Sequence, residues 1–384
     1  MARATNYFIF CTIFLATSAI SHADPTPATV PLPSASQVYP TVHMEPGAEL
    51  TEQGRNIRGV YLPYSKVVAW KSRKIARWVK TVGATAVIMD VKDDHGRVTF
   101  SRLMNNAKGY PHGAAFRMKK HVEALHAAGI YTIARLVCFK DNQLIRVQPK
   151  TAVRDRRTEK VWRDKGNLAW VDPHSEVVRD HIVAVAQAAE ELGFDEIQLD
   201  YVRFPVERAA KFARYPNKVG NPDRHKVIAT LLARIDAAVK IPLSIDVFGL
   251  TAYHRKDSKV LGQIIEHLAP YIDAISPMVY LANWPRRYWE NPKPSQTHAL
   301  VNNAVKSIRR RLGDNIAVRP LLQAFKWRAD NYGTAFILNQ INAAESGGSS
   351  GYIFWNQGGH YRKLSLVWQR IDAKLSNDFF HNEK

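Results

Sequence analysis

The sequence predicts an α/β protein of the (β/α)8 class, a TIM barrel, as a single domain over residues 55–378. Eight short apolar segments alternate with eight amphipathic ones, which is the number of elements in such a barrel. The apolar segments are nearly continuous, as parallel strands buried on both faces require. A doubly wound sheet is the main alternative. It usually carries a glycine-rich phosphate turn after an early strand, and the sequence has none.

Runs of strand-forming residues predict the strands, and apolar residues spaced three to four apart predict the helices. The strands are expected at 57–62, 84–91, 130–139, 193–205, 242–247, 272–280, 316–323 and 351–355. The helices are expected at 71–82, 119–128, 175–192, 225–239, 259–268, 297–312, 334–345 and 364–375. The loops after the third and sixth strands contain large aromatic residues, namely Trp162, Trp170, Trp284, Tyr288 and Trp289. We expect some of them to cap the core and others to line a site at the rim.

The first residues are typical of an export signal. Arg3 precedes an apolar stretch over 7–20, and Ser21-His22-Ala23 offers a small-residue cleavage site. We therefore expect a signal peptide at 1–23 and a periplasmic or extracellular protein, with an uncleaved anchor as the alternative. Residues 24–54 are rich in Pro, Ala, Ser and Thr, and they predict an unfolded linker.

Charge and cysteine content limit the partners. The formal net charge is +20, and it favours anionic polymers or the anionic cell envelope as partners. A generally basic, solvated surface is the alternative. No nucleic-acid motif accompanies the charge, so we expect no nucleic-acid partner. Only Cys11 and Cys138 are present, so removal of the signal leaves no pair for an intramolecular disulfide.

The segment 193–205 predicts a buried strand that ends in a carboxylate. Because strand side chains alternate, Glu196, Gln198 and Asp200 share one face. Polar groups on a buried face are costly unless they are paired or line a site. Pro205 cannot continue the strand, so Asp200 is expected at the carboxyl end, where barrels of this class carry their chemistry.

The same alternation places polar side chains near the carboxyl ends of the other strands. We expect a cluster there, made of Asp90, Lys92, Arg135, Asp200, Asp246, Tyr280, Gln323 and Asn356. Barrel interiors are normally filled by branched apolar residues, so this cluster predicts a site. Individual members could instead form structural ion pairs, and Arg135 with Glu196 is one that we expect.

Asp200 and Asp246 are the expected catalytic pair, because they end neighbouring strands. Two carboxylates that close push one pKa upward, which yields one acid and one nucleophile or base. We expect Asp200 to be the nucleophile, kept ionised by Arg203, and Asp246 to be the acid and base. Asp90 could instead position the substrate or exchange roles with Asp246.

Other chemistries are less well supported. Asp93, Asp94 and His95 lack the spacing of a calcium or zinc site, so we expect no metal and no cofactor. A turn into Gly96 accounts for them. There is no Gly-x-Ser-x-Gly segment for a serine hydrolase. No histidine falls at a strand end, as a phosphodiesterase barrel would need.

Several segments resemble a known family. They are 58–61, 87–94, 193–205, 246–250, 275–280 and 354–356, and the most specific is 200–205. Together they are similar to the family called "putative glycoside hydrolase domain", bacterial TIM-barrel proteins grouped with the alpha-amylase-like glycosidases. The resemblance covers nearly everything after the linker, and it implies a barrel that acts on carbohydrate.

The likeness to alpha-amylases proper is looser. It implies a nucleophile at Asp200, but those enzymes have Arg where this chain has Gln198, and Glu where it has Asp246. We therefore expect a glycosidase that acts on a cell-wall or extracellular polysaccharide, anionic in view of the charge. Asp90, Lys92, Arg135, Arg203, Tyr280, Trp284, Gln323 and Asn356 are its expected substrate-binding residues. The alternative is a non-catalytic protein that binds carbohydrate or the cell envelope on the same scaffold.

Overall fold

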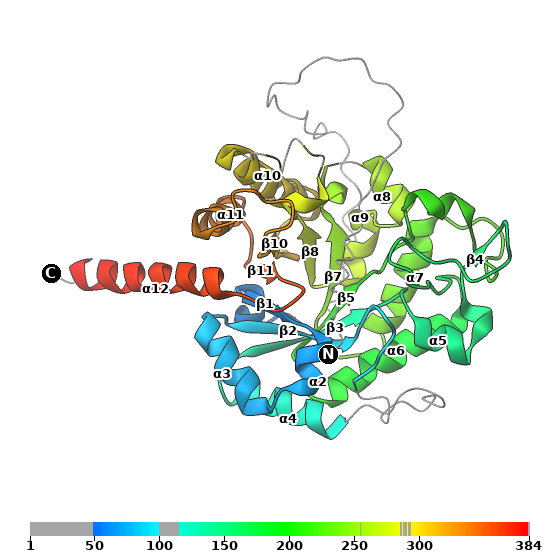
Figure 1. Ribbon diagram of the computed structural model, residues 1–384, viewed down its shortest axis with the longest axis horizontal. Helices are drawn as coiled ribbons and strands as arrows, with labels where there is room; N and C mark the ends of the chain where they lie inside the picture. Colours follow the sequence, from blue (N-terminus) through cyan, green and yellow to red (C-terminus); the bar gives the residue numbers. More distant parts are fainter. Residues whose placement is uncertain are drawn as a thin grey trace, which may run out of the picture.

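A closed barrel of parallel strands forms the centre of the molecule (Figure 1). The computed structural model describes residues 49–99, 115–253, 255–284, 286, 290 and 293–382. The barrel strands are β1 (Arg58–Leu62), β2 (Ala86–Lys92), β3 (Tyr131–Val137), β5 (Glu196–Asp200), β7 (Leu243–Phe248), β8 (Ala274–Met278), β9 (Ala317–Val318), β10 (Leu321–Gln323) and β11 (Tyr352–Trp355). They follow one another around the barrel in chain order, and β11 pairs with β1 to close it. The predicted fold class is confirmed.

Strands β9 and β10 together occupy the seventh position, where the sequence predicted one strand over 316–323. Both pair with β8, through Ala274 opposite Ala317 and Met278 opposite Leu321. Pro320 lies between them and cannot donate a hydrogen bond to the ladder, so the strand is interrupted there. The interruption places the preceding residue, Arg319, where its side chain reaches Glu196 on the far side of the barrel.

Helices surround the barrel (Figure 1). They are α1 (Glu52–Arg55), α2 (Tyr64–Ala69), α3 (Ser72–Val82), α4 (Ala115–His126), α5 (Asn142–Val147), α6 (Glu176–Glu191), α7 (Arg224–Asp236), α8 (Arg255–Leu261), α9 (Ile265–Leu268), α10 (Pro294–Leu312), α11 (Thr334–Ser346) and α12 (Arg362–Asn382). Short 3-10 helices are η2 (Pro149–Thr151), η3 (Arg208–Phe212), η4 (Gly249–Ala252), η5 (Ala269–Tyr271) and η6 (Leu281–Asn283). In the part of the chain that the structure describes, none of the helices has the length and apolar character needed to cross a membrane.

The fifth helix of the repeat differs from its prediction. The sequence predicted one helix over 259–268, whereas the structure has α8 and α9 with Gly262 between them. Gly262 has a φ of +79°, and a Cβ there would approach the Arg224 carbonyl oxygen at 3.0 Å. A residue in the left-handed backbone conformation ends an α-helix, so the predicted helix is divided in two at Gly262.

The apolar core has two layers. The outer layer lies between the sheet and the helices, and Val87, Leu136 and Ile182 belong to it. The inner layer fills the barrel and includes Ile88 and Ile133. Alternation along each strand sends successive side chains to the two layers, so inward positions can be read directly from the sequence.

Helix α1 covers the floor of the barrel, at the amino-terminal ends of the strands. Leu50 belongs to the inner apolar layer, and Gly54 lies so close to Tyr131 that a Cβ would meet its hydroxyl at 2.7 Å. The Gly54 carbonyl accepts a hydrogen bond from Arg319. Residues 49–54 were predicted as the end of the linker, but they are part of the barrel domain. The predicted signal peptide and the linker up to residue 48 lie outside the described residues.

A second, two-stranded sheet joins two loops on the barrel's carboxyl-terminal side. Strands β4 (Arg154–Asp155) and β6 (Ala213–Arg214) pair antiparallel, so the loop after β3 contacts the loop after β5. Trp162 and Trp170 are buried beside this sheet, with their rings 6.3 Å apart. These two tryptophans therefore cap the core, and they do not offer free faces to a ligand. Tyr288 and Trp289, also predicted at the rim, lie outside the described residues.

Candidate active site

Strand β5 directs three polar side chains into the barrel, as its alternation predicted. Glu196 is the deepest, fully buried with Arg319, whose Nη1 lies 2.9 Å from its Oε2. The expected pairing of Glu196 with Arg135 is therefore wrong. Gln198 contacts Ser276 across the barrel at 3.4 Å. Only Asp200, at the end of the strand, reaches the carboxyl-terminal mouth.

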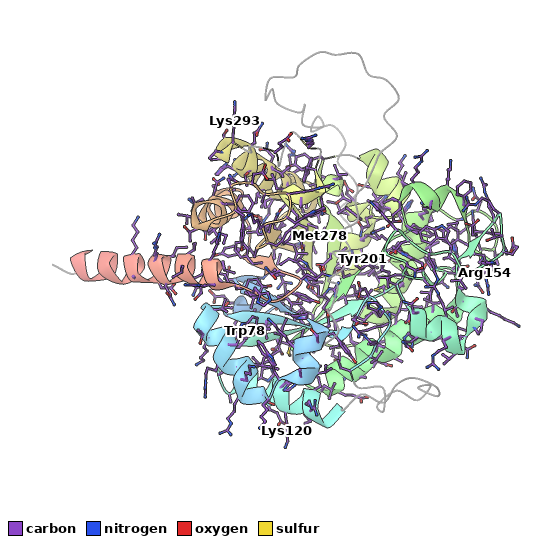
Figure 2. All side chains as sticks on the ribbon, viewed as in Figure 1. Trp78, Lys120, Arg154, Tyr201, Met278 and Lys293 are labelled. Carbon is purple, nitrogen blue, oxygen red and sulfur yellow. The ribbon has the colours of Figure 1, made fainter. Side chains whose placement is uncertain are left out.

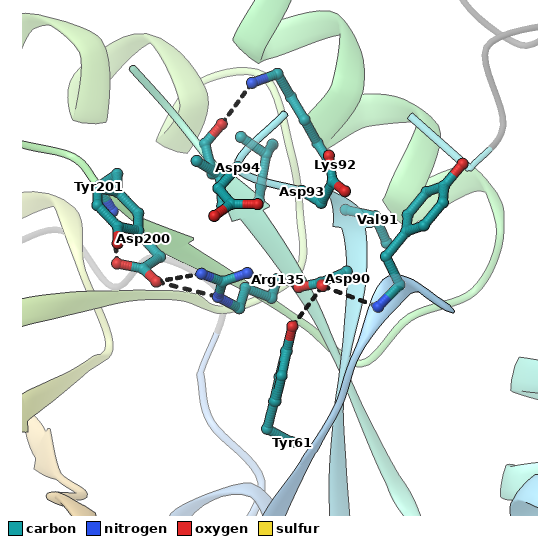
Figure 3. Close-up of polar contacts among 12 residues, drawn as sticks. Tyr61, Asp90, Val91, Lys92, Asp93, Asp94, Arg135, Asp200 and Tyr201 are labelled. Atoms are coloured by element: carbon teal, nitrogen blue, oxygen red, sulfur yellow. Dashed lines mark hydrogen bonds and ion pairs between the residues drawn. The ribbon is translucent and has the colours of Figure 1, made fainter. Parts of the chain in front are cut away.

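Arg135 on β3 links two carboxylates at the mouth (Figure 3). It donates to Asp200 Oδ2 through Nε at 3.1 Å and through Nη2 at 2.5 Å, and to Asp90 Oδ1 through Nη1 at 2.6 Å. The guanidinium is 4% exposed, so these ion pairs are shielded from water. One cation bonded to both acids fixes their positions relative to each other.

Asp90 on β2 has every oxygen occupied. Its Oδ2 accepts from the Tyr61 hydroxyl at 2.6 Å and from the Tyr64 backbone at 3.0 Å. Burial raises the pKa of Asp90, while Arg135 and these donors oppose the rise. With no free oxygen, Asp90 is better suited to holding Arg135 than to exchanging protons.

Asp246 on β7 is the opposite case. It is 1% exposed, and neither carboxyl oxygen has a hydrogen-bond partner among the described residues. Burial, and next the charge of Asp200, raise its pKa well above the usual range. The pairing of Leu199 with Ile245 makes Asp200 and Asp246 neighbours one step further along β5 and β7. The site thus pairs a carboxyl group held by Arg135, Asp200, with one that favours the protonated form, Asp246.

The backbone at the end of β5 holds the Asp200 carboxyl group in place. The Tyr201 backbone N–H donates to Asp200 Oδ1 at 2.6 Å. Tyr201 has a φ of +50°, a left-handed conformation that is unusual for a tyrosine. Such strained residues cluster at functional sites, because the surrounding structure must hold them there.

Tyr280 follows β8 and lies near both acids. Burial is the largest cause of its raised pKa, and the charges of Asp246 and Asp200 follow. Its ring packs edge-on against Phe325 at 5.9 Å between centroids. The structure therefore brings five of the predicted residues together at the mouth, namely Asp90, Arg135, Asp200, Asp246 and Tyr280.

Lys92 does not join them, although strict alternation on β2 predicted that it would. The ladder between β2 and β3 shifts register between Asp90 and Lys92. A bulge of this kind turns the following side chain to the other face. Lys92 is fully buried, where it bonds the carbonyls of Val137 and Lys140 and pairs with Asp141 at 3.0 Å. Its donors are all occupied, so it holds the loop after β3.

Gln323 and Asn356 also bind backbone groups. Gln323 is fully buried, donates to the carbonyls of Phe325 and Trp327, and accepts from the Ala282 N–H. Asn356 donates to the Ala324 carbonyl at 2.6 Å, and its oxygen accepts from the backbone after β11. Both side chains shape the rim loops from which substrate would be contacted.

Arg203 and Trp284 lie among aromatic rings. Arg203 is 2% exposed and sits over the rings of Trp170 and Phe248, 5.0 and 4.5 Å from their centroids. The cation hydrogen-bonded to Asp200 is thus Arg135, where the sequence suggested Arg203. Trp284 is half-buried and packs edge-on against Tyr253.

Two residues at the mouth were missed by the sequence analysis. Trp355, at the end of β11, stacks on Tyr61 with centroids 3.8 Å apart and an interplanar angle of 18°. Arg135 lies 4.9 Å from the Trp355 ring centroid and 5.4 Å from that of Tyr61. Both aromatics stand at ends of predicted strands, so the strand-end rule would have found them had it included aromatic side chains.

In the ranges that the structure describes, no group of three or more His, Cys, Asp or Glu side chains could hold an ion. Asp93, which belonged to the acidic turn noted in the sequence, accepts bonds from the backbone of His95 and Arg97 and pairs with the Arg97 side chain. Asp93 therefore stabilises the turn after β2.

Solved structures share this fold. The glycoside hydrolase domain of PgaB (BpsB) from Bordetella bronchiseptica matches with a TM-score of 0.61 and 12% identity, over 82% of this chain and 98% of that one. An alpha-L-fucosidase isoenzyme 2 from Paenibacillus thiaminolyticus matches with a TM-score of 0.53 and 13% identity, over 84% and 50%. The alpha-galactosidase TtGalA from Thermus thermophilus gives 0.51 and 16%, over 85% and 62%. At these identities the likeness concerns the fold alone.

The family assignment comes from the sequence. No curated protein matches the chain. A family model described as "Putative glycosyl hydrolase domain" matches residues 59–361, from the first strand to the start of the last helix. This confirms the resemblance seen in the motifs. The chain therefore belongs to that glycosyl hydrolase family, and it is a glycosidase by family membership.

Proposed function

We propose that the protein is an exported glycoside hydrolase that cleaves a cell-wall or extracellular polysaccharide with Asp200 as nucleophile and Asp246 as general acid and base. The observation that carries this proposal is the contrast between the two carboxyl groups. Asp200 is fixed by Arg135 and by the Tyr201 N–H, whereas Asp246 is buried without a hydrogen-bond partner among the described residues. Glycoside hydrolysis needs one carboxylate and one protonated carboxyl group.

The proposed hydrolysis has two steps, in which Asp246 transfers protons and Asp200 forms a covalent intermediate. Asp246 gives its proton to the glycosidic oxygen, the bond from this oxygen to the anomeric carbon breaks, and Asp200 bonds to that carbon. Water then attacks the glycosyl–Asp200 ester while Asp246 takes the proton from the water, which restores both groups. Arg135 supports the first step, because its two hydrogen bonds hold Asp200 in a fixed position.

The distance between the two carboxyl groups would decide between retention and inversion at the anomeric carbon. Asp200 and Asp246 follow the paired residues Leu199 and Ile245. Neighbouring strands lie about 4.8 Å apart. Retaining enzymes hold their carboxyl groups about 5–5.5 Å apart, and inverting enzymes about 6.5–9.5 Å.

The remaining mouth residues would bind the sugar. Trp355 is half-buried beside Arg135 and offers an aromatic edge at the rim, and Tyr280 places a hydroxyl near both acids. The net charge of +20 favours an anionic polymer, and the export-signal pattern at 1–23 supports a substrate outside the cytoplasm.

The test is release of reducing sugar from a panel of bacterial and plant polysaccharides. Wild type is compared with Asp200→Asn, with Asp246→Asn, and with Asp314→Asn as a matched change at an exposed carboxylate. We expect Asp200→Asn to abolish release and Asp314→Asn to leave it unchanged. Turnover that persists in Asp200→Asn would refute the assignment of the nucleophile.

A non-catalytic binding protein is the second candidate, favoured by the burial of the two acids. Asp246 is 1% exposed and Asp200 is 6% exposed. If wild type binds a glycan, releases no sugar from any polymer, and Asp200→Asn binds equally well, this candidate replaces the first.

A further inference from the structure

Helices α2, α3 and α4 carry a one-sided concentration of positive charge. From Tyr64 to Val82 the chain has six cationic residues and no acidic one. Helix α4 packs against α3 and adds three more cations. We call this surface the basic patch, and it consists of Lys66, Lys71, Arg73, Lys74, Arg77, Lys80, Arg117, Lys119 and Lys120, together with Trp70 and Trp78. Figure 2 shows Trp78 and Lys120 on the same side of the molecule.

Three cations of the basic patch form no ion pair that the structure describes, although α4 also carries the exposed Glu123. Lys71, Arg73 and Lys74 are exposed, and no ion pair with a carboxylate is found for them in the described part of the chain. Elsewhere, exposed cations do find acids, as Arg234 does with Glu176 on the neighbouring helix. Burial is the main cause that lowers the pKa of Lys66, and repulsion from the nearby Lys74 adds to it. A bound anion would relieve that repulsion.

The basic patch also contains two tryptophan side chains and a cavity. Trp70 and Trp78 are both half-buried, with ring centroids 5.8 Å apart. Lys74 lies 4.4 Å from the Trp70 centroid, and Lys66 lies 5.0 Å from it. A cavity of about 390 Å³ opens beside Trp70, and Lys71 and Arg117 also line it. Indole surface beside fixed cations suits a sugar ring that bears a negative group.

The basic patch starts at the rim of the active site. Helix α2 begins at Tyr64, whose backbone N–H donates to Asp90 of the mouth cluster. From there α2 leads outward to Trp70 and into α3. The start of the basic patch is therefore tied by a hydrogen bond to the mouth cluster.

We propose that the basic patch is an accessory binding site for an anionic polysaccharide, separate from the residues that cleave bonds. A polysaccharide fits better than a lipid surface, because the cavity and the half-buried indoles need a ligand that enters them. This accessory site is proposed independently of the catalytic roles of Asp200 and Asp246. Binding to it is measured separately from turnover, so either proposal can fail alone.

The test measures binding of polygalacturonate, a polyuronate, to the full chain carrying Asp200→Asn, with neutral dextran and phosphatidylglycerol vesicles as comparison ligands. In this background Lys71→Glu/Lys74→Glu reverses two charges in the basic patch. Acidic residues are favourable in the first turn of a helix, so α3 should remain folded. The matched control is Lys306→Glu/Arg310→Glu on α10, which Figure 1 shows on the opposite side of the barrel.

We expect Lys71→Glu/Lys74→Glu to weaken polygalacturonate binding by about tenfold or more, and the α10 pair to change it much less. Trp70→Ala should also weaken binding, but the salt dependence of the dissociation constant should stay the same, because no charge is removed. Equal losses in both charge-reversal pairs, or no binding by the parent, would overturn the proposal. So would loss of vesicle binding alone, which would assign the basic patch to lipid.

Discussion

Asp200 and Asp246 stand at matching positions on neighbouring strands, yet their surroundings differ completely. Asp200 accepts two hydrogen bonds from Arg135 and one from the Tyr201 backbone, whereas both oxygens of Asp246 lack a partner in the described structure. Like charges at this separation cannot both ionise easily. Arg135 holds Asp200 in place, while burial and the charge of Asp200 raise the pKa of Asp246, and this difference fits the proposed roles of nucleophile and acid.

Replacing Asp246 by Asn should affect substrates according to their leaving groups. The variant cannot donate a proton, so hydrolysis of natural glycosidic bonds should fall about 100- to 10,000-fold. Aryl glycosides with acidic leaving groups need little protonation, so formation of the glycosyl–enzyme should be much less impaired for them. The measurement is kcat on both substrate classes together with burst kinetics. An equal loss on both classes would show that Asp246 is not the acid.

Arg135→Gln should destabilise the fold as well as the site. It leaves Asp90 and Asp200 buried without their common cation, and the expected loss in the free energy of unfolding is about 3–5 kcal/mol. Arg135→Lys restores the charge but not the forked geometry, so it should recover part of the stability and little activity. Urea unfolding and sugar release measured on the same samples check this. A fully stable, fully active Arg135→Gln would contradict the bridging role.

The buried pair of Arg319 and Glu196 gives a double-mutant test of the barrel interior. Both side chains are fully buried and make mutual hydrogen bonds. Arg319→Met alone leaves the buried carboxylate of Glu196 without its cation and should cost about 3–5 kcal/mol. Adding Glu196→Gln removes that charge, so the double variant should be more stable than Arg319→Met. Additive losses in a chemical unfolding cycle would mean that the two residues are not coupled.

Asp273, at the start of β8, should make stability depend on pH. Burial is the main cause that raises its pKa to about 6, although it accepts a hydrogen bond from the Leu243 N–H at 2.8 Å. Because the folded pKa lies above the unfolded value of about 3.9, the stabilising contribution is complete below the unfolded pKa. It is lost as pH rises through about 6.

Asp273→Asn removes this titration and can keep the hydrogen bond to Leu243. The variant should therefore gain stability relative to wild type between pH 4 and 7, by up to about 2–3 kcal/mol. Urea midpoints of both proteins across this range give the difference directly. A difference that does not change with pH would contradict the raised pKa.

The fold could be predicted because the strands are apolar runs separated by helical periodicity. The breaks within predicted elements could not be predicted, because each depends on the backbone conformation at a single residue. Pro320 divides the seventh strand, and Gly262 divides a helix, and neither residue shows by itself how the chain continues beyond it. The pairing of β4 with β6 joins loops that are far apart in sequence, so no local pattern indicates it.

The same limit applies to the site. Alternation correctly directed Asp90, Arg135, Asp200 and Asp246 to the mouth, because their strands are regular up to those residues. It failed for Lys92, since a bulge turns that side chain away. It also chose the wrong partner for Glu196, because Arg319 reaches it from the opposite side of the barrel, a distance in space that sequence spacing does not encode.

The position of α1 sets the direction in which the enzyme faces. The chain enters the barrel at its floor, where Gly54 is bonded to Arg319, while the carboxylate pair lies at the opposite pole. The chain before Glu49 therefore joins the domain at the pole opposite the carboxylate pair, so its point of attachment does not obstruct the mouth.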